Sequence, residues 1–304
     1  MIKLGALGDL VQAMGSFAAI RLTHATSFIV LLTRESYADF MQDSPYFDAI
    51  WVDKRPKVWE VRSLLVLRVR LRGGRFSRVY DLQTSERSSF YFWLMGRPAW
   101  SGISCGCAYP HANPHRDLLH TIDRQAEQLA IAGISVIPAP DLSWVRVDKT
   151  RFKMRYPFVL MVSGGAPHRP DKRWPAECYA RLAVQIACDG CTPVLIGSSH
   201  DRTQIARITE VCPQAVDLSE KTVFADLVEL GRNAVAAVGN DTGPMHLLAA
   251  SGCPCVVLYG PSSDPTLCAP RGHHVITLRC SHLSDLPVLA VRSVLTNFSK
   301  ETVK

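Results

Sequence analysis

Three short segments carry the residue types that bind phosphate and move protons. The first, Gly239-Asn240-Asp241-Thr242-Gly243-Pro244-Met245-His246, stands between an apolar run and a helical pattern. A small, polar strand-to-helix turn leaves backbone N–H groups exposed at the helix N-terminus, where the helix dipole favours an anion. Gly243 permits close approach, the Thr242 hydroxyl can donate to a phosphate oxygen, and His246 lies one turn in on the same face. The alternative is that Asp241 or Thr242 only caps the helix, which explains one residue of the eight.

The second segment, Ser163 to Pro175, is a glycine-containing loop after an apolar run. Gly164 and Gly165 would let the backbone approach a diphosphate. The loop carries four potential cations before the next helix: His168, Arg169, Lys172 and Arg173. Trp174 follows them, and we interpret it as a core residue rather than a substrate platform.

The third segment, Lys3-Leu4-Gly5-Ala6-Leu7-Gly8-Asp9, opens the chain. Its two glycines predict a tight turn after a short first strand. Leu10, Met14 and Phe17 then mark one face of a helix, with Asp9 at its N-terminus. Taken alone, Asp9 is best interpreted as a helix cap.

The octet and the residues after it closely resemble the signature of glycosyltransferase family 9, the bacterial lipopolysaccharide heptosyltransferases and their relatives. The matching residues continue through Leu247-Leu248-Ala249-Ala250, Gly252-Cys253-Pro254 and Leu258-Tyr259-Gly260-Pro261. The resemblance runs from Leu4 to about Arg271, and it is weak between about 90 and 150. It implies an α/β GT-B fold, with two doubly wound Rossmann-like domains facing across a cleft. It also implies inverting transfer of a sugar without a metal or other cofactor.

The resemblance also assigns roles to individual residues. Asp9 becomes the general base that takes the proton from the acceptor hydroxyl, a role worth roughly 10²- to 10⁴-fold in rate. The family carries a lysine that is separated by one residue from a Trp-Pro pair, where it neutralises the leaving diphosphate, and Lys172 matches it. Without a metal, that charge needs stabilisation, which Lys172, Thr242 and the amides of Thr242 and Gly243 would share. Arg173 is a rival for the part of Lys172.

Two further segments resemble the family less clearly: one on the acceptor side, and one that departs from the family pattern at a single residue. Gln83, Arg87 and Ser88 match the family's acceptor-side segment and could bind a sugar or phosphate; a helix start capped by Thr84 or Ser85 is the alternative. In Asp217-Leu218-Ser219-Glu220-Lys221-Thr222, Glu220 stands where the family has glycine. That substitution leaves the nucleotide base and the sugar open.

Histidines and cysteines could hold a metal, but their spacing argues against it. His111, His115 and His120 surround Arg116 and Asp117, an arrangement we interpret as a polar acceptor loop rather than a metal cluster. The ten cysteines include no C-x-x-C pair, so we expect neither a zinc nor a redox site. Four of them lie in or beside apolar runs and are expected in or near the core: Cys188, Cys191, Cys253 and Cys255.

Length and composition indicate a globular protein of two domains of about 150 residues each. The chain has 304 residues, of which 47% are hydrophobic and 20% charged. It has neither an apolar run of about 18 residues nor a secretory leader, so we expect it in the cytoplasm. A proline-rich segment, 136–157, predicts a junction between an acceptor domain, 1–150, and a donor domain, 151–304. The last helix, 287–298, is expected either to pack within the second domain or to pack back on the first.

Apolar runs alternate with helical patterns, which predicts parallel sheets with crossover helices. Strands are expected at 1–4, 27–32, 49–52, 78–82, 158–162, 192–196, 215–218, 234–238 and 254–259. Helices are expected at 10–22, 58–71, 175–188, 200–211, 223–231, 242–251 and 287–298. The first strand is short, which leaves a truncated start as one interpretation.

The net charge of +7 is concentrated in one stretch. Nine Lys or Arg residues lie between Trp51 and Tyr80, against Asp53 and Glu60. This stripe is either a solvated helix face or a surface for an anionic membrane or a phosphorylated acceptor. The chain has no nucleic-acid recognition module and no aromatic interleaving, so we expect no nucleic-acid partner.

These observations favour transfer of heptose, from ADP-heptose or a related nucleotide-sugar, to a lipopolysaccharide core acceptor. Peripheral contact with the inner membrane is consistent with the basic stripe. The alternatives are a GT-B enzyme with another donor or acceptor, a nucleotide-sugar epimerase, and a non-catalytic nucleotide-sugar-binding protein. The sugar, the nucleotide, the linkage and the oligomeric state are not determined by the sequence.

Overall fold

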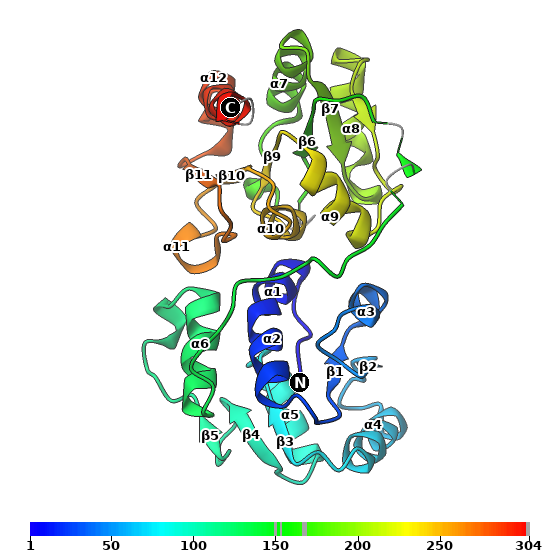
Figure 1. Cartoon of the computed structure of the whole chain (residues 1–304), viewed down its shortest axis with the longest axis vertical. Coiled ribbons are helices and arrows are strands. Elements are labelled where there is room, and N and C mark those ends of the chain that lie inside the picture. Colours follow the sequence, from blue (N-terminus) through cyan, green and yellow to red (C-terminus); the bar gives the residue numbers. More distant parts are fainter. Residues whose placement is uncertain (149–150, 153, 166–168, 302–304) are drawn as a thin grey trace. The chain divides into compact units, whose positions relative to one another are not determined.

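The chain forms two compact units, Met1–Pro140 and Asp141–Lys304, each with its own parallel sheet structure (Figure 1). The computed structural model describes residues 1–148, 151–152, 154–165 and 169–301. Every strand pair in the described part is parallel. The predicted alternation of strands and crossover helices is therefore confirmed.

The first unit contains two small sheets and six α-helices in the part described. Its strands are β1 (Val30–Thr33), β2 (Ala49–Val52), β3 (Arg78–Tyr80), β4 (Ala99–Gly102) and β5 (Tyr109–Pro110), paired as β1-β2 and β3-β4-β5. Its helices are α1 (Leu7–Gln12), α2 (Met14–Thr23), α3 (Glu35–Gln42), α4 (Val61–Gly73), α5 (Glu86–Leu94) and α6 (Thr121–Ile131). One core cluster includes Leu67 and Leu71 of α4 together with Trp100 of β4.

The start of the chain joins the two small sheets without forming a regular strand. Ile2 makes isolated parallel bridges to Leu32 on one side and to Asp81 on the other. Its amide donates to Tyr80 O at 2.9 Å, and the Lys3 amide donates to Leu32 O at 3.1 Å. The predicted strand 1–4 is therefore wrong as a regular strand, because the turn at Gly5 ends the pairing after one bridged residue.

The predicted helix 10–22 is two helices. α1 begins at Leu7, and Ala13 separates it from α2. Leu10, Met14 and Phe17 are completely buried, as their spacing predicts. The helix-starting turn lies three residues earlier than expected, so Asp9 lies in the first turn of α1 and Ala6 is the N-cap. The cap interpretation of Asp9 is wrong.

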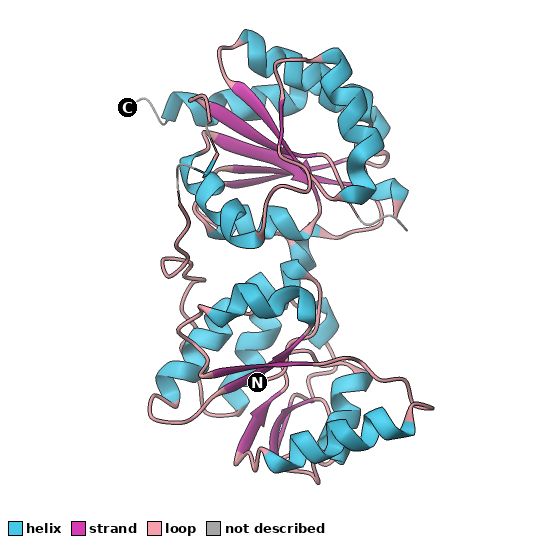
Figure 2. Cartoon of the chain, turned by 90° about the vertical axis from the view of Figure 1, so that its right-hand side faces the viewer, coloured by secondary structure: helices cyan, strands magenta, loops and turns pink. Residues whose placement is uncertain are grey.

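The second unit is built on one six-stranded sheet in the order β11-β10-β9-β6-β7-β8. Its strands are β6 (Phe158–Val162), β7 (Thr192–Ile196), β8 (Val216–Asp217), β9 (Ala236–Asn240), β10 (Cys255–Tyr259) and β11 (Val275–Arg279). Its helices are α7 (Ala176–Cys188), α8 (Arg202–Val211), α9 (Phe224–Asn233), α10 (Gly243–Ala250), α11 (Pro265–Cys268) and α12 (Val288–Glu301). Helices cover both faces of this sheet (Figure 2). The strand β11 was not predicted, because none of its residues is fully buried and the apolar signal is weak.

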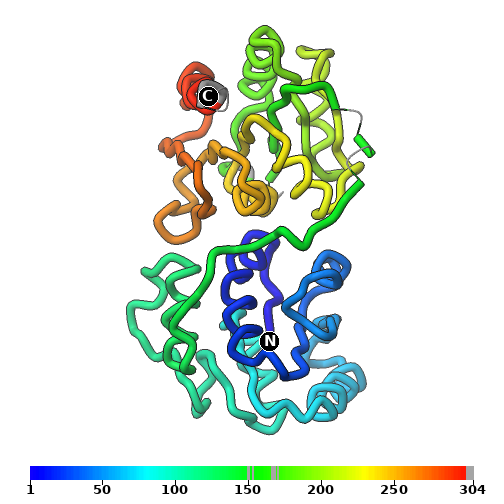
Figure 3. The backbone as a smooth tube through the Cα atoms, viewed as in Figure 1, coloured from blue at the N-terminus to red at the C-terminus, as the bar shows by residue number. Residues whose placement is uncertain are grey.

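The last helix packs within the second unit. Val291, Leu295 and Phe298 of α12 are buried in the core cluster that also holds Trp174 and Tyr179. Figure 3 shows α12 beside α7, and α12 also contacts β9 and β10. The predicted helix 287–298 is confirmed.

The order of the strands brings two loops together. β6 pairs with β7 on one side and with β9 on the other. The strands after β6 are therefore added to the sheet first on one side of β6 and then on the other. Val162, the last residue of β6, lies opposite Gly239. The loops that follow β6 and β9 therefore leave the same edge of the sheet side by side, at a topological switch point where α/β proteins bind ligands.

The cysteines are placed mostly as their neighbours in sequence predict. Cys253 and Cys255 are buried, but Cys188 is exposed because it lies in the last turn of α7 on the solvent side. All ten cysteines are free thiols. Among the described residues, no helix is long and apolar enough to span a bilayer.

Candidate active site

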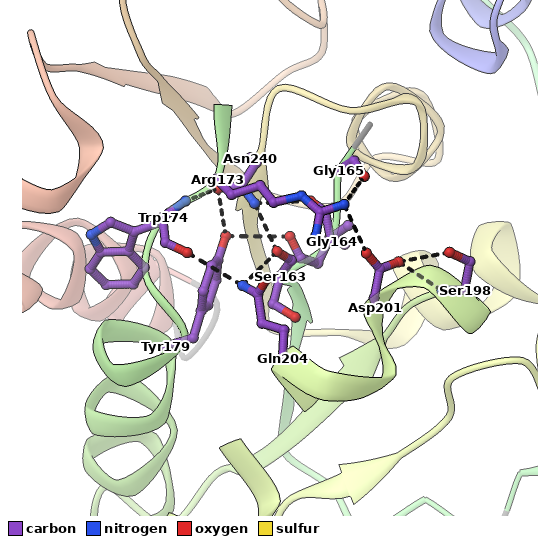
Figure 4. A network of polar contacts seen from close by, with 11 residues as sticks. Ser163, Gly164, Gly165, Arg173, Trp174, Tyr179, Ser198, Asp201, Gln204 and Asn240 are labelled. Atoms are coloured by element: carbon purple, nitrogen blue, oxygen red, sulfur yellow. Dashed lines mark hydrogen bonds and ion pairs between the residues drawn. The ribbon is translucent and has the colours of Figure 1, made fainter. Parts of the chain in front are cut away.

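One buried amide ties together the segments that follow β6 and β9 (Figure 4). The Asn240 side chain is completely buried, and its Nδ2 donates to the carbonyls of Ser163 and Gly164, both at 2.9 Å. Its Oδ1 accepts from the Trp174 amide at 3.0 Å and the Tyr179 hydroxyl at 3.1 Å. Asn240 therefore fixes the glycine loop against the octet. The sequence motifs assign no role to Asn240, although a polar residue that ends a buried strand is a signal for one.

Lys172, Asp241 and Ser263 form the polar centre of this edge. Lys172 Nζ donates to Asp241 Oδ2 at 2.7 Å, and Ser263 Oγ donates to the same oxygen at 2.7 Å. Burial raises the pKa of Asp241, but the hydrogen bonds from Lys172 and Ser263 outweigh it and hold the pKa below the ordinary value. Asp241 is therefore a carboxylate that positions the Lys172 ammonium. Ser263 was not predicted, since it lies two residues beyond Pro261, where the recognised motif ends.

The N-terminus of α10 lies next to this centre. α10 begins at Gly243 with Thr242 at the N-cap, but the Thr242 side chain makes no capping hydrogen bond. Within the described residues its buried hydroxyl has no hydrogen-bond partner. A Cβ placed on Gly165 would lie 3.8 Å from Thr242 Cγ2, so the two loops approach closely. The unused hydroxyl and the first-turn amides of α10 form an anion-binding end.

His246 lies one turn into α10 and is buried. Its charge contributes to the low pKa of Asp241. The structure thus brings together the predicted donor-side residues, which lie on the two loops and α10: Gly164, Gly165, Lys172, Asp241, Thr242, Gly243 and His246.

Lys172 and Arg173 make different contacts in the structure. The Arg173 guanidinium donates to Gly165 O and lies 3.5 Å from Asp201 Oδ1, so it braces the glycine loop (Figure 4). Asp201 in turn accepts from the amide and hydroxyl of Ser198, at 2.9 and 2.8 Å. Lys172 is the cation held beside the α10 end. His168 lies outside the described residues.

Trp174 is a core residue, as predicted. Its side chain is completely buried, and its ring packs edge-on against Tyr179 with centroids 4.9 Å apart. The Trp174 Nε1 group donates to Leu286 O at 3.1 Å. The indole therefore anchors the segment that carries Lys172 to the core of the second unit.

In the first unit, Asp9 and Gln83 gather around Gly5. A Cβ on Gly5 would lie 2.7 Å from Asp9 Oδ2 and 3.2 Å from Gln83 Oε1, so a side chain there would displace the Asp9 carboxylate. Gln83 Oε1 accepts from the Leu4 amide at 2.7 Å, which fixes the side chain. The two polar groups thus share one small site at the turn, as a base and an acceptor-binding group would require.

Arg87 and Ser88 are differently placed. Ser88 is completely buried, and it forms a reciprocal capping box with Ser85 at the start of α5. The cap interpretation is confirmed for Ser85, and the Ser88 hydroxyl is used within the helix start. Arg87 Nη1 donates to the Tyr91 hydroxyl at 3.1 Å and lies 3.3 Å from Pro56 O. An acceptor-binding role for Arg87 and Ser88 stays a prediction.

The histidine-rich loop has structural partners. His111 is buried, with Nε2 3.5 Å from Glu127 Oε2, and burial lowers its pKa. The His120 side chain accepts from the Ile122 amide at 3.2 Å and caps α6. No group of three or more His, Cys, Asp or Glu side chains within the described ranges is arranged to hold a metal ion.

Glu220 has the backbone conformation that favours glycine. Its φ of 58° is in the left-handed region, which explains why the family pattern has glycine here. The Glu220 carboxylate makes two contacts with the Arg202 guanidinium, at 2.6 and 3.1 Å. The departure from the family pattern therefore adds an ion pair and leaves the turn intact.

The chain matches known proteins along most of its length. The model of glycosyltransferase family 9 (heptosyltransferase) matches residues 64–297. Lipopolysaccharide heptosyltransferase 2 of Escherichia coli strain K12 is 30% identical over 237 residues, which cover 69% of this chain and 66% of that protein. Lipooligosaccharide heptosyltransferase 2 of Haemophilus influenzae is 38% identical over 104 residues, covering 33% of this chain and 30% of that protein. The matched segments thus span from about a third to about two thirds of these relatives.

A solved structure extends the likeness of the fold to the whole chain. The E. coli ADP-heptose lipopolysaccharide heptosyltransferase II has a TM-score of 0.83 and 23% identity, covering 100% of this chain and 98% of that one. The predicted α/β fold of the GT-B type is confirmed. The family signature at 239–261 carries the polar centre described above. From the sequence match and this architecture, the chain belongs to glycosyltransferase family 9, the heptosyltransferase family.

Proposed function

We propose that this protein transfers heptose from ADP-heptose to a lipopolysaccharide core acceptor, with inversion at the anomeric carbon and without a metal ion. Membership of the family and the similarity to lipopolysaccharide heptosyltransferase 2 support the reaction class and the acceptor. The similarity to the E. coli ADP-heptose lipopolysaccharide heptosyltransferase II supports ADP-heptose as donor. The proposal includes a place at the cytoplasmic face of the inner membrane, where such an acceptor would be met.

The observation that carries the proposal is the Lys172–Asp241–Ser263 centre beside the α10 N-terminus. An ammonium group has three N–H donors, and Asp241 takes one of those of Lys172. The remaining donors, the Thr242 hydroxyl and the first α10 amides suit the oxygens of a leaving diphosphate. These groups are fixed before the reaction, as stabilisation of a developing charge requires.

In the proposed reaction, the acceptor hydroxyl oxygen forms a bond to the anomeric carbon as the bond from that carbon to the diphosphate oxygen breaks. Asp9 takes the hydroxyl proton. Gln83, fixed beside Asp9 around Gly5, is placed to orient the acceptor. The nucleoside diphosphate departs with its charge balanced by Lys172.

Donor identity is tested by thermal stabilisation with ADP, UDP, GDP and ADP-heptose, since a ligand that binds the native state raises its stability. Stabilisation by the two ADP compounds alone supports the proposal. A shift with UDP or GDP in their place would exclude ADP-heptose as the donor. Unchanged transfer in the presence of EDTA is expected, and its loss would contradict metal independence.

The catalytic assignment is tested with two variants and a control. Asp9→Asn is expected to lower kcat by roughly 10²- to 10⁴-fold while ADP still stabilises the protein, because only the proton acceptor is lost. Lys172→Ala is expected to lower kcat by roughly 10²- to 10³-fold and to weaken ADP binding as well. Arg207→Ala, on the exposed face of α8, should change neither. Full activity of Asp9→Asn would remove Asp9 from the mechanism.

A further inference from the structure

Helix α4 presents an apolar row to solvent. Its inner side is anchored by Leu67 and Leu71, which are buried. Val61, Leu65 and Val69 recur every fourth residue, so they lie in one row, and they are 60%, 50% and 72% exposed. We define the α4 surface as this outward face with the preceding turn: Trp59, Val61, Arg62, Leu65, Val66, Arg68 and Val69. Figure 1 shows α4 at the edge of the first unit.

Exposed apolar residues also lie beside this row and in the turn before α4. Trp59 is 71% exposed and Val66 is 69% exposed. The Lys57 ammonium lies 5.2 Å from the centre of the Trp59 ring. Large apolar side chains gathered on a surface in this way mark an interaction site more often than chance exposure.

The cations of this region are of two kinds. Arg70 and Arg72 are held by the protein: the Arg70 guanidinium stacks on Trp51 at 4.7 Å, and Arg72 Nε donates to Leu94 O at 2.9 Å. Arg62 and Arg68 are exposed, and no ion pair is found for them among the described residues. Two free guanidinium groups therefore accompany the apolar row.

The two acidic residues of the segment offset only part of this charge. Asp53 is buried and accepts from the Tyr91 hydroxyl at 2.7 Å, and Glu60 accepts from the Lys57 amide at 2.5 Å. A cavity of about 570 Å³ adjoins α4, and its lining combines cations with apolar groups. The lining includes the cations Lys54, Arg62 and Arg70, one carboxylate, Glu60, and the apolar Val66 and Leu67. This combination suits an anionic headgroup attached to an apolar chain.

We propose that the α4 surface docks onto an anionic phospholipid bilayer. A bilayer interface accepts apolar side chains at the acyl boundary, arginines at the phosphates and tryptophan at headgroup level. A second copy of the chain would bring two cationic faces together, and nucleic acid would leave Val61, Leu65 and Val69 without apolar contacts. This inference deepens the proposed function by naming the surface that meets the membrane. It rests on the proposed function only in that a lipopolysaccharide acceptor gives the protein a reason to meet the membrane.

The charge part of the proposal is tested by vesicle co-sedimentation of the full chain. The vesicles contain phosphatidylcholine alone, or phosphatidylcholine and phosphatidylglycerol in equal parts. Binding only to the anionic vesicles is expected, weakening with salt. The double variant Arg62→Glu, Arg68→Glu is expected to bind at least about 20-fold more weakly, since each cation near such a surface contributes about a fivefold factor. Arg34→Glu, Arg181→Glu, with the same change in net charge at exposed sites elsewhere, should retain most of the binding.

The apolar part is tested at constant charge. Leu65→Ser, Val69→Ser should bind several-fold more weakly, whereas Leu22→Ser, Leu289→Ser, at sites 74% and 66% exposed, should bind like the parent. Equal losses in the variants and their controls would overturn the proposal, and so would equal binding to both kinds of vesicle. A concentration-dependent dimer that the Leu65→Ser, Val69→Ser variant abolishes would also overturn it, because the surface would then belong to a second copy.

The outcome is separable from that of the proposed function. None of the substituted residues lies in the site described above, so stabilisation by ADP and transfer to a detergent-dispersed acceptor should be unchanged in all variants. Loss of vesicle binding with these properties intact supports the membrane surface. Vesicle binding by a protein that transfers no sugar would contradict the proposed function and leave the α4 surface in place.

Discussion

Asp81 is a buried carboxyl group whose ionisation acts against folding. Its side chain is completely buried after β3, and Oδ1 accepts from the amides of Gln83 and Thr84 at 3.1 and 3.0 Å. Burial outweighs these bonds and raises the pKa of Asp81 from 3.8 to about 6. The folded protein therefore holds this proton more tightly than the unfolded chain, and the contribution of Asp81 to stability falls as pH rises through that interval.

Replacing Asp81 with asparagine tests the direction of this pH dependence. Asparagine keeps an oxygen for the two amides and cannot ionise, so the free energy of unfolding of Asp81→Asn relative to the parent should rise between pH 4 and 6. The rise is expected to reach at most about 3 kcal/mol, since one pKa unit corresponds to about 1.4 kcal/mol. Urea unfolding at several pH values measures it, with the exposed Asp43→Asn as control. If the difference in the free energy of unfolding does not change with pH, the pKa of Asp81 is not raised.

At the scale of elements, the glycine loop after β6 depends on one close approach. A Cβ on Gly164 would lie 2.5 Å from the Asp201 carboxyl carbon, whereas a Cβ on Gly165 would meet Arg173 Cγ at 3.4 Å. Asp201 is buried and held by Ser198, so it has little room to move. The loop is therefore shaped by α8's leading turn as well as by its own sequence.

Gly164→Ala is expected to lower the free energy of unfolding by about 1 to 3 kcal/mol, the usual cost of forcing an extra group into a packed site. Gly165→Ala, its neighbour, should cost less than about 1 kcal/mol because the added methyl group finds ordinary contacts. Thermal and urea unfolding compare the two. Equal stability of both variants would mean that Asp201 moves aside freely.

At the scale of the whole molecule, the second unit contains every predicted donor-side residue. It has a six-stranded sheet, helices on both faces and its own core cluster, to which α12 contributes. A unit with its own core can fold alone. We therefore expect residues 141–304, expressed separately, to unfold cooperatively and to be stabilised by ADP. A fragment without a cooperative transition would show that the first unit is needed for folding, and calorimetry distinguishes the two results.

The sequence by itself determined the parallel α/β architecture and the identity of the donor-side residues. Apolar runs of five residues, as at β6 and β10, indicate strands buried on both faces, and small polar residues before a helix indicate an anion-binding turn. These are local properties, so spacing and composition reveal them. The exposed strand β11, the break at Ala13 and the start of α1 depend on packing against neighbours, and the sequence pattern did not predict them.

Only the tertiary structure decided which of two adjacent cations faces the polar centre. Lys172 and Arg173 are adjacent cations in the sequence. In the structure Lys172 pairs with Asp241 and Arg173 with Asp201, and these two acids lie on different elements. The parts of Asn240 and Ser263 likewise depend on side chains separated by many residues along the chain. Contacts of this kind follow from the strand order, which places the ends of β6 and β9 together, and no local pattern reveals them.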